Sequence, residues 1–180
     1  MNEIENILEP KERVEWTGNP KASAYFTAHY LMLTAIASVF GILLYSSQYS
    51  KLWLLAVGGG WLVLMITTTL SYFKIFYAIT NKRVILQSGL IGRDFKSVDY
   101  DQIQNVSVKR GIFDVIFGIG SIRIFSGEME MVSGGSRGNR YGGTRAKYDV
   151  FSHIPDSYSV LKLVQTHLSK RKENLYAGRT

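Results

Sequence analysis

The chain has 180 residues, with 21 Lys and Arg against 14 Asp and Glu, which gives a formal net charge of +7. It contains no cysteine, so disulfide scaffolds, thiolate metal sites and cysteine nucleophiles are excluded. The charge is unevenly distributed, because residues 24–73 hold a single charged side chain, that of Lys51. Since a soluble globular domain does not segregate its charge in this way, we expect a membrane part and a polar part.

Two uncharged apolar stretches, residues 24–45 and 52–73, predict a transmembrane helical hairpin. At about 1.5 Å per residue, each helix is long enough to cross a hydrocarbon core of about 30 Å. One alternative is a pair of buried core helices, but the mostly polar remainder of the chain is too small to enclose them. The other is a cleaved signal peptide, which the acidic segment before the first stretch does not fit.

The distribution of basic residues predicts the orientation of this hairpin. Only Lys51 lies between the two spans, whereas seven basic residues lie close to them on the other side. These are Lys11, Arg13, Lys21, Lys74, Lys82, Arg83 and Arg93. Because basic residues are enriched on the cytoplasmic side, we expect a plasma-membrane protein with both termini in the cytoplasm. Gly41 and the glycines at 58–60 either form the packing faces of the two helices or reflect how common glycine is in such helices.

The rest of the chain predicts short antiparallel strands followed by one helix. Alternating or apolar runs bounded by turn residues mark the strands at 75–80, 83–88, 94–100, 103–110, 121–126 and 147–154. The connector at 111–120 is apolar and bounded by glycines. Pro155 suits the first turn of an amphipathic C-terminal helix. We therefore expect an α+β membrane protein in which a small antiparallel β-barrel is capped by that helix.

This organisation divides the chain into four regions. They are an N-terminal segment at 1–23, the hairpin at 24–73, a cytoplasmic domain at 74–172 and a tail at 173–180. The N-terminal segment is acidic, with Glu at positions 3, 5, 9, 12 and 15. We expect it to fold back onto the basic domain by charge attraction.

Several motifs of the domain recur together in one known family. They are YAITNKR at 77–83, GLI at 89–91, IQNV at 103–106 and FGIGSI at 117–122. With the preceding LEPKERVEWTGNPK segment and the two spans, the chain resembles the membrane-anchored members of the bacterial pleckstrin-homology (PH) domain proteins. The resemblance implies a PH-like fold tethered to a membrane, without catalysis or a cofactor, that acts through binding or assembly.

Five basic residues after the second span are candidates for contact with anionic lipid headgroups: Lys74, Lys82, Arg83, Arg93 and Lys96. The alternative is that they only obey the positive-inside bias and keep the domain soluble. The first hairpin holds only Lys82 and Arg83, so specific recognition of phosphoinositides is not expected. A protein partner or a second copy of the chain remains the principal expectation.

The glycine-rich tract at 133–145 holds a second candidate set, Arg137, Arg140 and Arg145. Arginines bind phosphate groups well, but the tract lacks the Gly-Lys-Ser/Thr of a phosphate-binding loop, and a mobile hairpin loop is the preferred interpretation. Nucleic-acid binding is not expected, because no known module is present. Asp99 and Asp101 have no third ligand for a metal, and no catalytic motif or small-molecule substrate is indicated.

Overall fold

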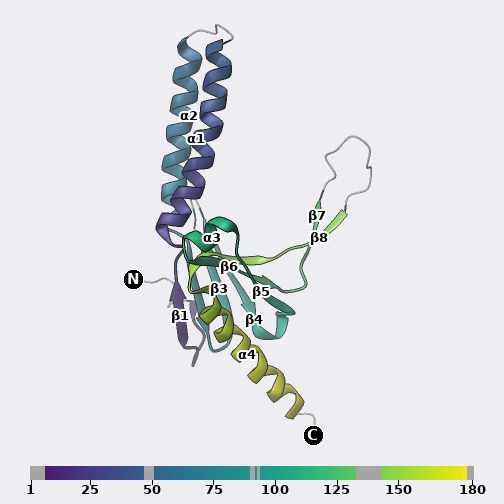
Figure 1. Cartoon of the computed structure of the whole chain (residues 1–180). Coiled ribbons are helices and arrows are strands. Elements are labelled where there is room, and N and C mark those ends of the chain that lie inside the picture. The colour runs from purple at the N-terminus through teal and green to yellow at the C-terminus, as the bar shows by residue number, and fades with distance from the viewer. Residues whose placement is uncertain (1–6, 47–50, 90–91, 93, 133–142, 178–180) are drawn as a thin grey trace.

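The computed structural model describes residues 7–46, 51–89, 92, 94–132 and 143–177. Two long helices stand side by side, and a small domain of antiparallel sheets and one further long helix lies at their lower end (Figure 1). The expected α+β class, with a helical hairpin, antiparallel sheets and a C-terminal helix, is confirmed.

The two apolar stretches form α1 (Ala22–Ser46) and α2 (Lys51–Tyr72). Both helices are long and apolar enough to cross a membrane, and in the most apolar 18-residue window of each helix no residue is buried inside the protein. Leu31 of α1, for example, is 66% exposed, and Leu55 of α2 is 71% exposed. The alternative of two buried core helices is therefore wrong, because a core helix would bury these side chains against the rest of the chain.

The hairpin is held by a polar contact near its lower end and not by its glycines. The Tyr30 hydroxyl lies 2.6 Å from Thr69 Oγ1, which itself donates to the Met65 carbonyl. Tyr30 is therefore the donor of the contact between the helices. A Cβ added at Gly41, or at any of residues 58–60, would meet no atom of the other helix within 4 Å. The packing role considered for these glycines is not supported.

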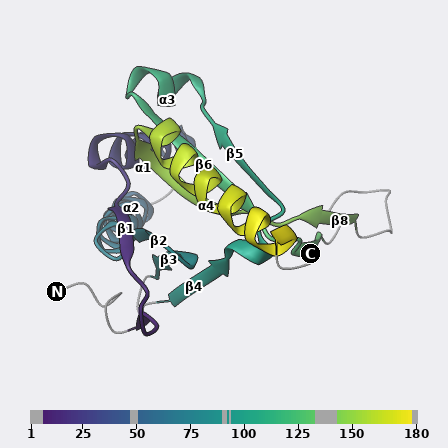
Figure 2. The same ribbon diagram turned by 90° about the horizontal axis from the view of Figure 1, so that it is seen from below.

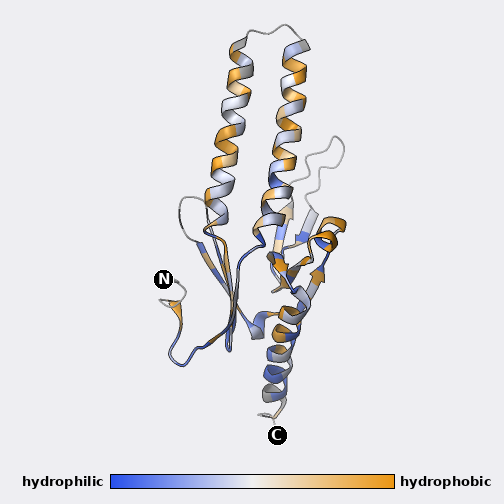
Figure 3. Ribbon diagram, turned by 60° about the vertical axis from the view of Figure 1, so that its left-hand side comes forward, coloured by the Kyte–Doolittle hydropathy of each residue, from blue (hydrophilic) through white to orange (hydrophobic). Residues whose placement is uncertain are grey.

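The chain leaves α2 directly into a four-stranded sheet with the order β1-β2-β3-β4. Its strands are β1 (Val14–Gly18), β2 (Phe76–Thr80), β3 (Arg83–Ser88) and β4 (Asp94–Asp99). Because β2 begins four residues after α2 ends, it runs away from the helices, and the turn at 81–82 lies at the far end of the domain (Figure 3). Strand β1, which pairs with β2, was not predicted.

A second, three-stranded sheet has the order β5-β6-β9 and follows the 3-10 helix η2 (Tyr100–Gln102). Its strands are β5 (Asn105–Lys109), β6 (Ile119–Phe125) and β9 (Asp149–Pro155). The short helix α3 (Ile112–Ile116) connects β5 to β6, and α4 (Ser157–Ala177) crosses the sheet (Figure 2). The ribbon of β7 (Met129–Val132) and β8 (Gly143–Ala146) projects from the domain.

The two sheets face each other across one hydrophobic core and do not close into a barrel. Among the described strands, no ladder joins β4 to β5 or β1 to β9, so the expectation of a closed barrel is wrong. Side chains hold the sheets together instead: Phe151 of β9 is fully buried and stacks on Tyr77 of β2, with ring centroids 4.5 Å apart. Val160 and Val164 of α4 complete this core, which confirms the apolar face predicted for the helix.

Candidate functional site: a polar groove at the far end of the domain

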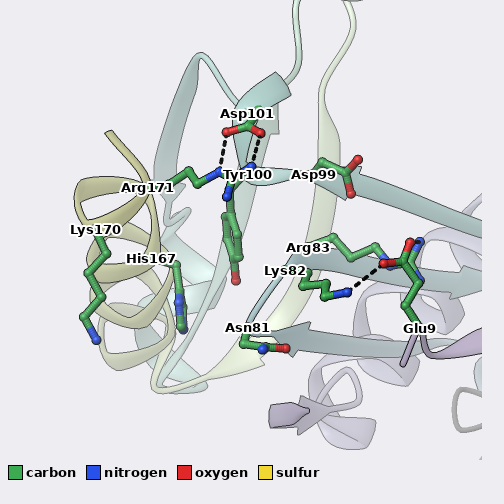
Figure 4. A pocket seen from close by; sticks show the side chains of 10 residues that line it. All are labelled: Glu9, Asn81, Lys82, Arg83, Asp99, Tyr100, Asp101, His167, Lys170 and Arg171. Carbon is green, nitrogen blue, oxygen red and sulfur yellow. Dashed lines mark hydrogen bonds and ion pairs between the residues drawn. The ribbon is translucent and has the colours of Figure 1, made fainter. Parts of the chain in front are cut away.

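A groove of about 520 Å³ opens at the end of the domain that lies away from α1 and α2 (Figure 4). Four structural units line it, namely the N-terminal segment, the β2–β3 turn, η2 with the end of β4, and the second half of α4. The lining residues are Glu9, Asn81, Lys82, Arg83, Asp99, Tyr100, Asp101, His167, Lys170 and Arg171. We call this site the distal groove.

One wall of the distal groove is fixed by a buried ion pair. The carboxylate of Glu12 has a fully buried side chain and accepts hydrogen bonds from Arg83 Nη2 at 2.9 Å and Nε at 3.1 Å. It also accepts from the Thr80 hydroxyl at 2.7 Å and from the Glu9 N–H at 2.8 Å. Burial alone would raise the pKa of Glu12, but these donors outweigh it and hold the pKa below its usual value. The carboxylate therefore stays ionised and orients Arg83.

The floor is formed by Tyr100, whose hydroxyl donates to the Thr80 carbonyl at 2.7 Å. Its burial raises the pKa of the phenol, so the group acts only as a neutral donor. The ring of His167 from α4 stacks on Tyr100 with centroids 5.1 Å apart, and His167 Nε2 lies 2.8 Å from Glu15 Oε2. The C-terminal helix, the sheet and the N-terminal segment thus meet at one point.

The rim is charged and exposed. Arg171 binds both oxygens of Asp101, at 2.8 and 2.7 Å, and Lys82 Nζ lies 2.9 Å from Glu9 Oε2. The hydrogen bonds from Arg171 lower the pKa of Asp101. Lys170, also on the rim, has no ion-pair partner among the residues that the structure describes. Charges of both signs therefore surround the opening.

The basic residues expected to share one membrane-facing surface are separated in the structure. Lys82 and Arg83 lie at the far end of β2, which at about 3.3 Å per residue is some 15 to 20 Å from the end of α2. That distance is about two Debye lengths at physiological salt, so neither cation is strongly attracted to a leaflet at the helix ends. Lys96 of β4 binds Glu128 and Asp149, each at 2.9 Å. Of the four that the structure describes, Lys74 alone adjoins the end of α2.

The remaining candidates lie outside these surfaces. Arg93, Arg137 and Arg140 lie outside the described residues. Arg145 is on β8, opposite Glu130 of β7 in the register of the ribbon. Asp101 is bound by Arg171, and within the described part of the chain no group of three His, Asp or Glu side chains is placed to hold a metal ion.

The sequence analysis missed the contribution of α4 to the groove. Three residues of this helix line the groove, namely His167, Lys170 and Arg171, and none of them was a predicted site residue. By contrast, the expected return of the acidic N-terminal segment is confirmed at three positions, because Glu9, Glu12 and Glu15 all pair with groups of the domain. In the sequence, these glutamates were the signal that charged side chains gather at the far end of the domain.

One comparison with known proteins, that with models of protein families, identifies a family for this chain. A family model described as a bacterial PH domain matches residues 25–149, a range that includes most of α1, all of α2 and the strands from β2 to β8. A solved structure of a DUF1696 family protein with a pleckstrin-homology domain, from Shewanella loihica PV-4, is 18% identical in sequence. The match covers 54% of this chain and 73% of that chain, with a TM-score of 0.33. No curated protein matches the sequence.

Proposed function

Because the chain belongs to the bacterial PH domain family, we propose that it is a non-catalytic binding module anchored in the plasma membrane. In this proposal, α1 and α2 cross the bilayer and the PH-like domain lies in the cytoplasm. The length and apolar surface of the two helices support the anchor. The excess of Lys and Arg on the side of the domain supports the orientation.

The distal groove carries the second half of the proposal, which is that the domain binds a protein partner in the cytoplasm. The groove includes the β2–β3 turn, which lies a strand's length beyond the end of α2, so it faces away from the membrane that the helices would occupy. A site for a small organic ligand is mostly apolar and enclosed, whereas this opening is lined almost entirely by charged and polar side chains. Such a surface fits a protein segment that carries complementary charges of both signs.

Site-specific photocrosslinking in cells tests this role. A photoreactive phenylalanine analogue is placed at Asn81 or at Lys170, both on the groove, and at Ser107, which is exposed on β5 outside it. We expect a discrete protein adduct from both groove positions and none from Ser107. In the variant that carries the analogue at position 81, the further substitution Lys170→Glu reverses one charge on the rim. We expect it to reduce the amount of adduct by at least about fivefold.

The size of the adduct separates the possible occupants. An adduct between two differently tagged copies of the chain would make self-assembly the function of the groove. Equal adducts from Ser107 and from the groove positions, unaffected by Lys170→Glu, would contradict the proposal, because the crosslinks would then report collisions and not a site.

A further inference from the structure

Helix α3 exposes nearly all of its apolar side chains. Ile112 is 82% exposed, Phe113 70%, Val115 61% and Ile116 71%. Apolar side chains of this size contribute to stability only when they are removed from water, and four of them within five residues form a patch that a monomeric soluble domain does not usually leave bare. The helix begins at Gly111 and ends before Gly118, whose φ of +63° suits glycine, so the segment is a defined helical turn.

The patch lies against the lower end of α1. A mostly apolar cavity of about 170 Å³ separates Phe113 and Phe117 from Ala24, Ala28 and Leu31 of α1. Lys21 Nζ donates to the Phe117 carbonyl at 2.9 Å, which ties the turn after α3 to the start of α1. Figures 1 and 3 show α3 at the height of the lower ends of the two helices.

The length of α1 fixes the depth of this contact. The apolar part of α1, Ala22–Tyr45, has 24 residues and is therefore about 36 Å long, against a hydrocarbon core of about 30 Å. If the hydrocarbon core lies entirely within the length of this helix, at most about 6 Å of the lower end of the helix extends below the core. Leu31 is about 13 Å above the start of the helix, so in an anchored chain it lies inside the core, and Phe113 of α3 lines the same cavity as Leu31.

We propose that α3 inserts into the boundary between the headgroups and the acyl chains of the leaflet that α1 and α2 enter. This inference rests on the membrane anchoring proposed above. The bilayer is the occupant because the patch continues the apolar surface of α1 at the level of the leaflet. Lys109, which is exposed, lies three residues before the helix, where a cation can meet anionic headgroups. The carboxylate of Asp114 on α3 accepts from the Gly111 N–H at 2.8 Å.

The absence of cysteine allows a direct test in the full chain. Single cysteines carrying an environment-sensitive fluorophore are introduced as Ile116→Cys on α3, Ser107→Cys on β5 and Phe40→Cys within α1. Each variant is reconstituted into vesicles that contain doxyl-labelled lipids, with the quencher either shallow or deep in the bilayer. We expect shallow quenchers to reduce the emission from position 116 at least about twofold, and to leave the emission from position 107 unchanged.

The label at position 40 separates this inference from the proposed function. Quenching at position 40 without quenching at 116 would overturn the insertion of α3 while leaving the anchor intact. Absence of quenching at position 40 would overturn the anchor itself, and the inference with it. A blue-shifted but unquenched label at 116 would mean that protein covers the patch, which also overturns the inference.

A second variant tests the apolar side chains as the cause. With the fluorophore at Val115, the double substitution Ile112→Ser and Ile116→Ser changes only exposed side chains. We expect most of the quenching at position 115 by lipids with a shallow quencher to be lost in this variant. Unchanged quenching would show that α3 is held near the leaflet by the rest of the domain and not by its own insertion.

Discussion

His153 joins the domain to the start of α1. Its backbone carbonyl accepts from the Lys21 N–H at 2.8 Å, and its ring lies edge-on to Tyr25 with centroids 6.2 Å apart. The residue has a φ of 55°, a positive value that few non-glycine residues adopt, although Asn, Asp and His adopt it more often than the others. Its Nδ1 is buried without a hydrogen-bond partner among the described residues. Burial lowers the pKa of the imidazole, and His29 lowers it further, against an opposing effect of Asp114.

This lowered pKa predicts acid sensitivity with a definite sign. The unfolded chain takes up the proton at the ordinary pKa of 6.5, before the folded chain does. The stability contributed by neutral His153 is therefore complete above this pH and is lost as the pH falls below it. We expect His153→Asn, which tolerates positive φ and does not titrate, to show a smaller fall in thermal midpoint between pH 7.5 and 5.5. Equal falls for the two proteins would exclude His153 as the source.

At the scale of elements, the buried pair of Glu12 and Arg83 fastens the N-terminal segment to the β2–β3 hairpin. Glu12→Gln removes the charge that compensates Arg83, whose side chain is only 16% exposed. We expect it to lower the free energy of unfolding by about 1.5 to 3 kcal/mol, the range for hydrogen bonds to charged groups. Thermal unfolding of the full chain in detergent, followed by tryptophan fluorescence, measures the change.

The matched control is Glu9→Gln, three residues away. Glu9 lies 2.9 Å from Lys82 Nζ and 3.7 Å from Arg83 Nη1, and because its side chain is 54% exposed, both contacts are screened by solvent. We expect the control to change stability by less than about 1 kcal/mol. Comparable losses for both variants would show that the N-terminal segment is held by total charge and not by the buried pair.

The alternation of apolar side chains was enough to predict most of the strands. The stretch 83–88 coincides with β3, and 94–100 differs from β4 by one residue. Strand β1 was missed because its five residues, VEWTG, are too few for their alternation to stand out, and the strand is recognisable only by its pairing with β2. The prediction of a closed barrel was wrong for a related reason. Pairing between β4 and β5 depends on the path of the chain through η2, and the periodicity of the sequence does not describe that path.

At the scale of the whole molecule, part of the candidate site could be predicted from the sequence and part could not. The turn containing Lys82 was predicted, and the direction of β2 away from the second apolar helix was enough to place that turn far from the ends of the two apolar helices. That step was not taken, because nearness in sequence to the second span was read as nearness in space. The share of α4 in the groove was out of reach, since no local pattern relates Arg171 to Asp101, 70 residues earlier.

The central claim is that the helices cross the membrane and leave the distal groove in the cytoplasm. The most direct test is the reactivity of single cysteines with a membrane-impermeant maleimide, using Lys170→Cys in the groove and Gln48→Cys in the segment between the two apolar helices. In intact bacterial cells, we predict labelling of the Gln48 variant only, with the Lys170 variant labelled after permeabilisation. Labelling of the Lys170 variant in intact cells would contradict the account, because the groove would then face the outside.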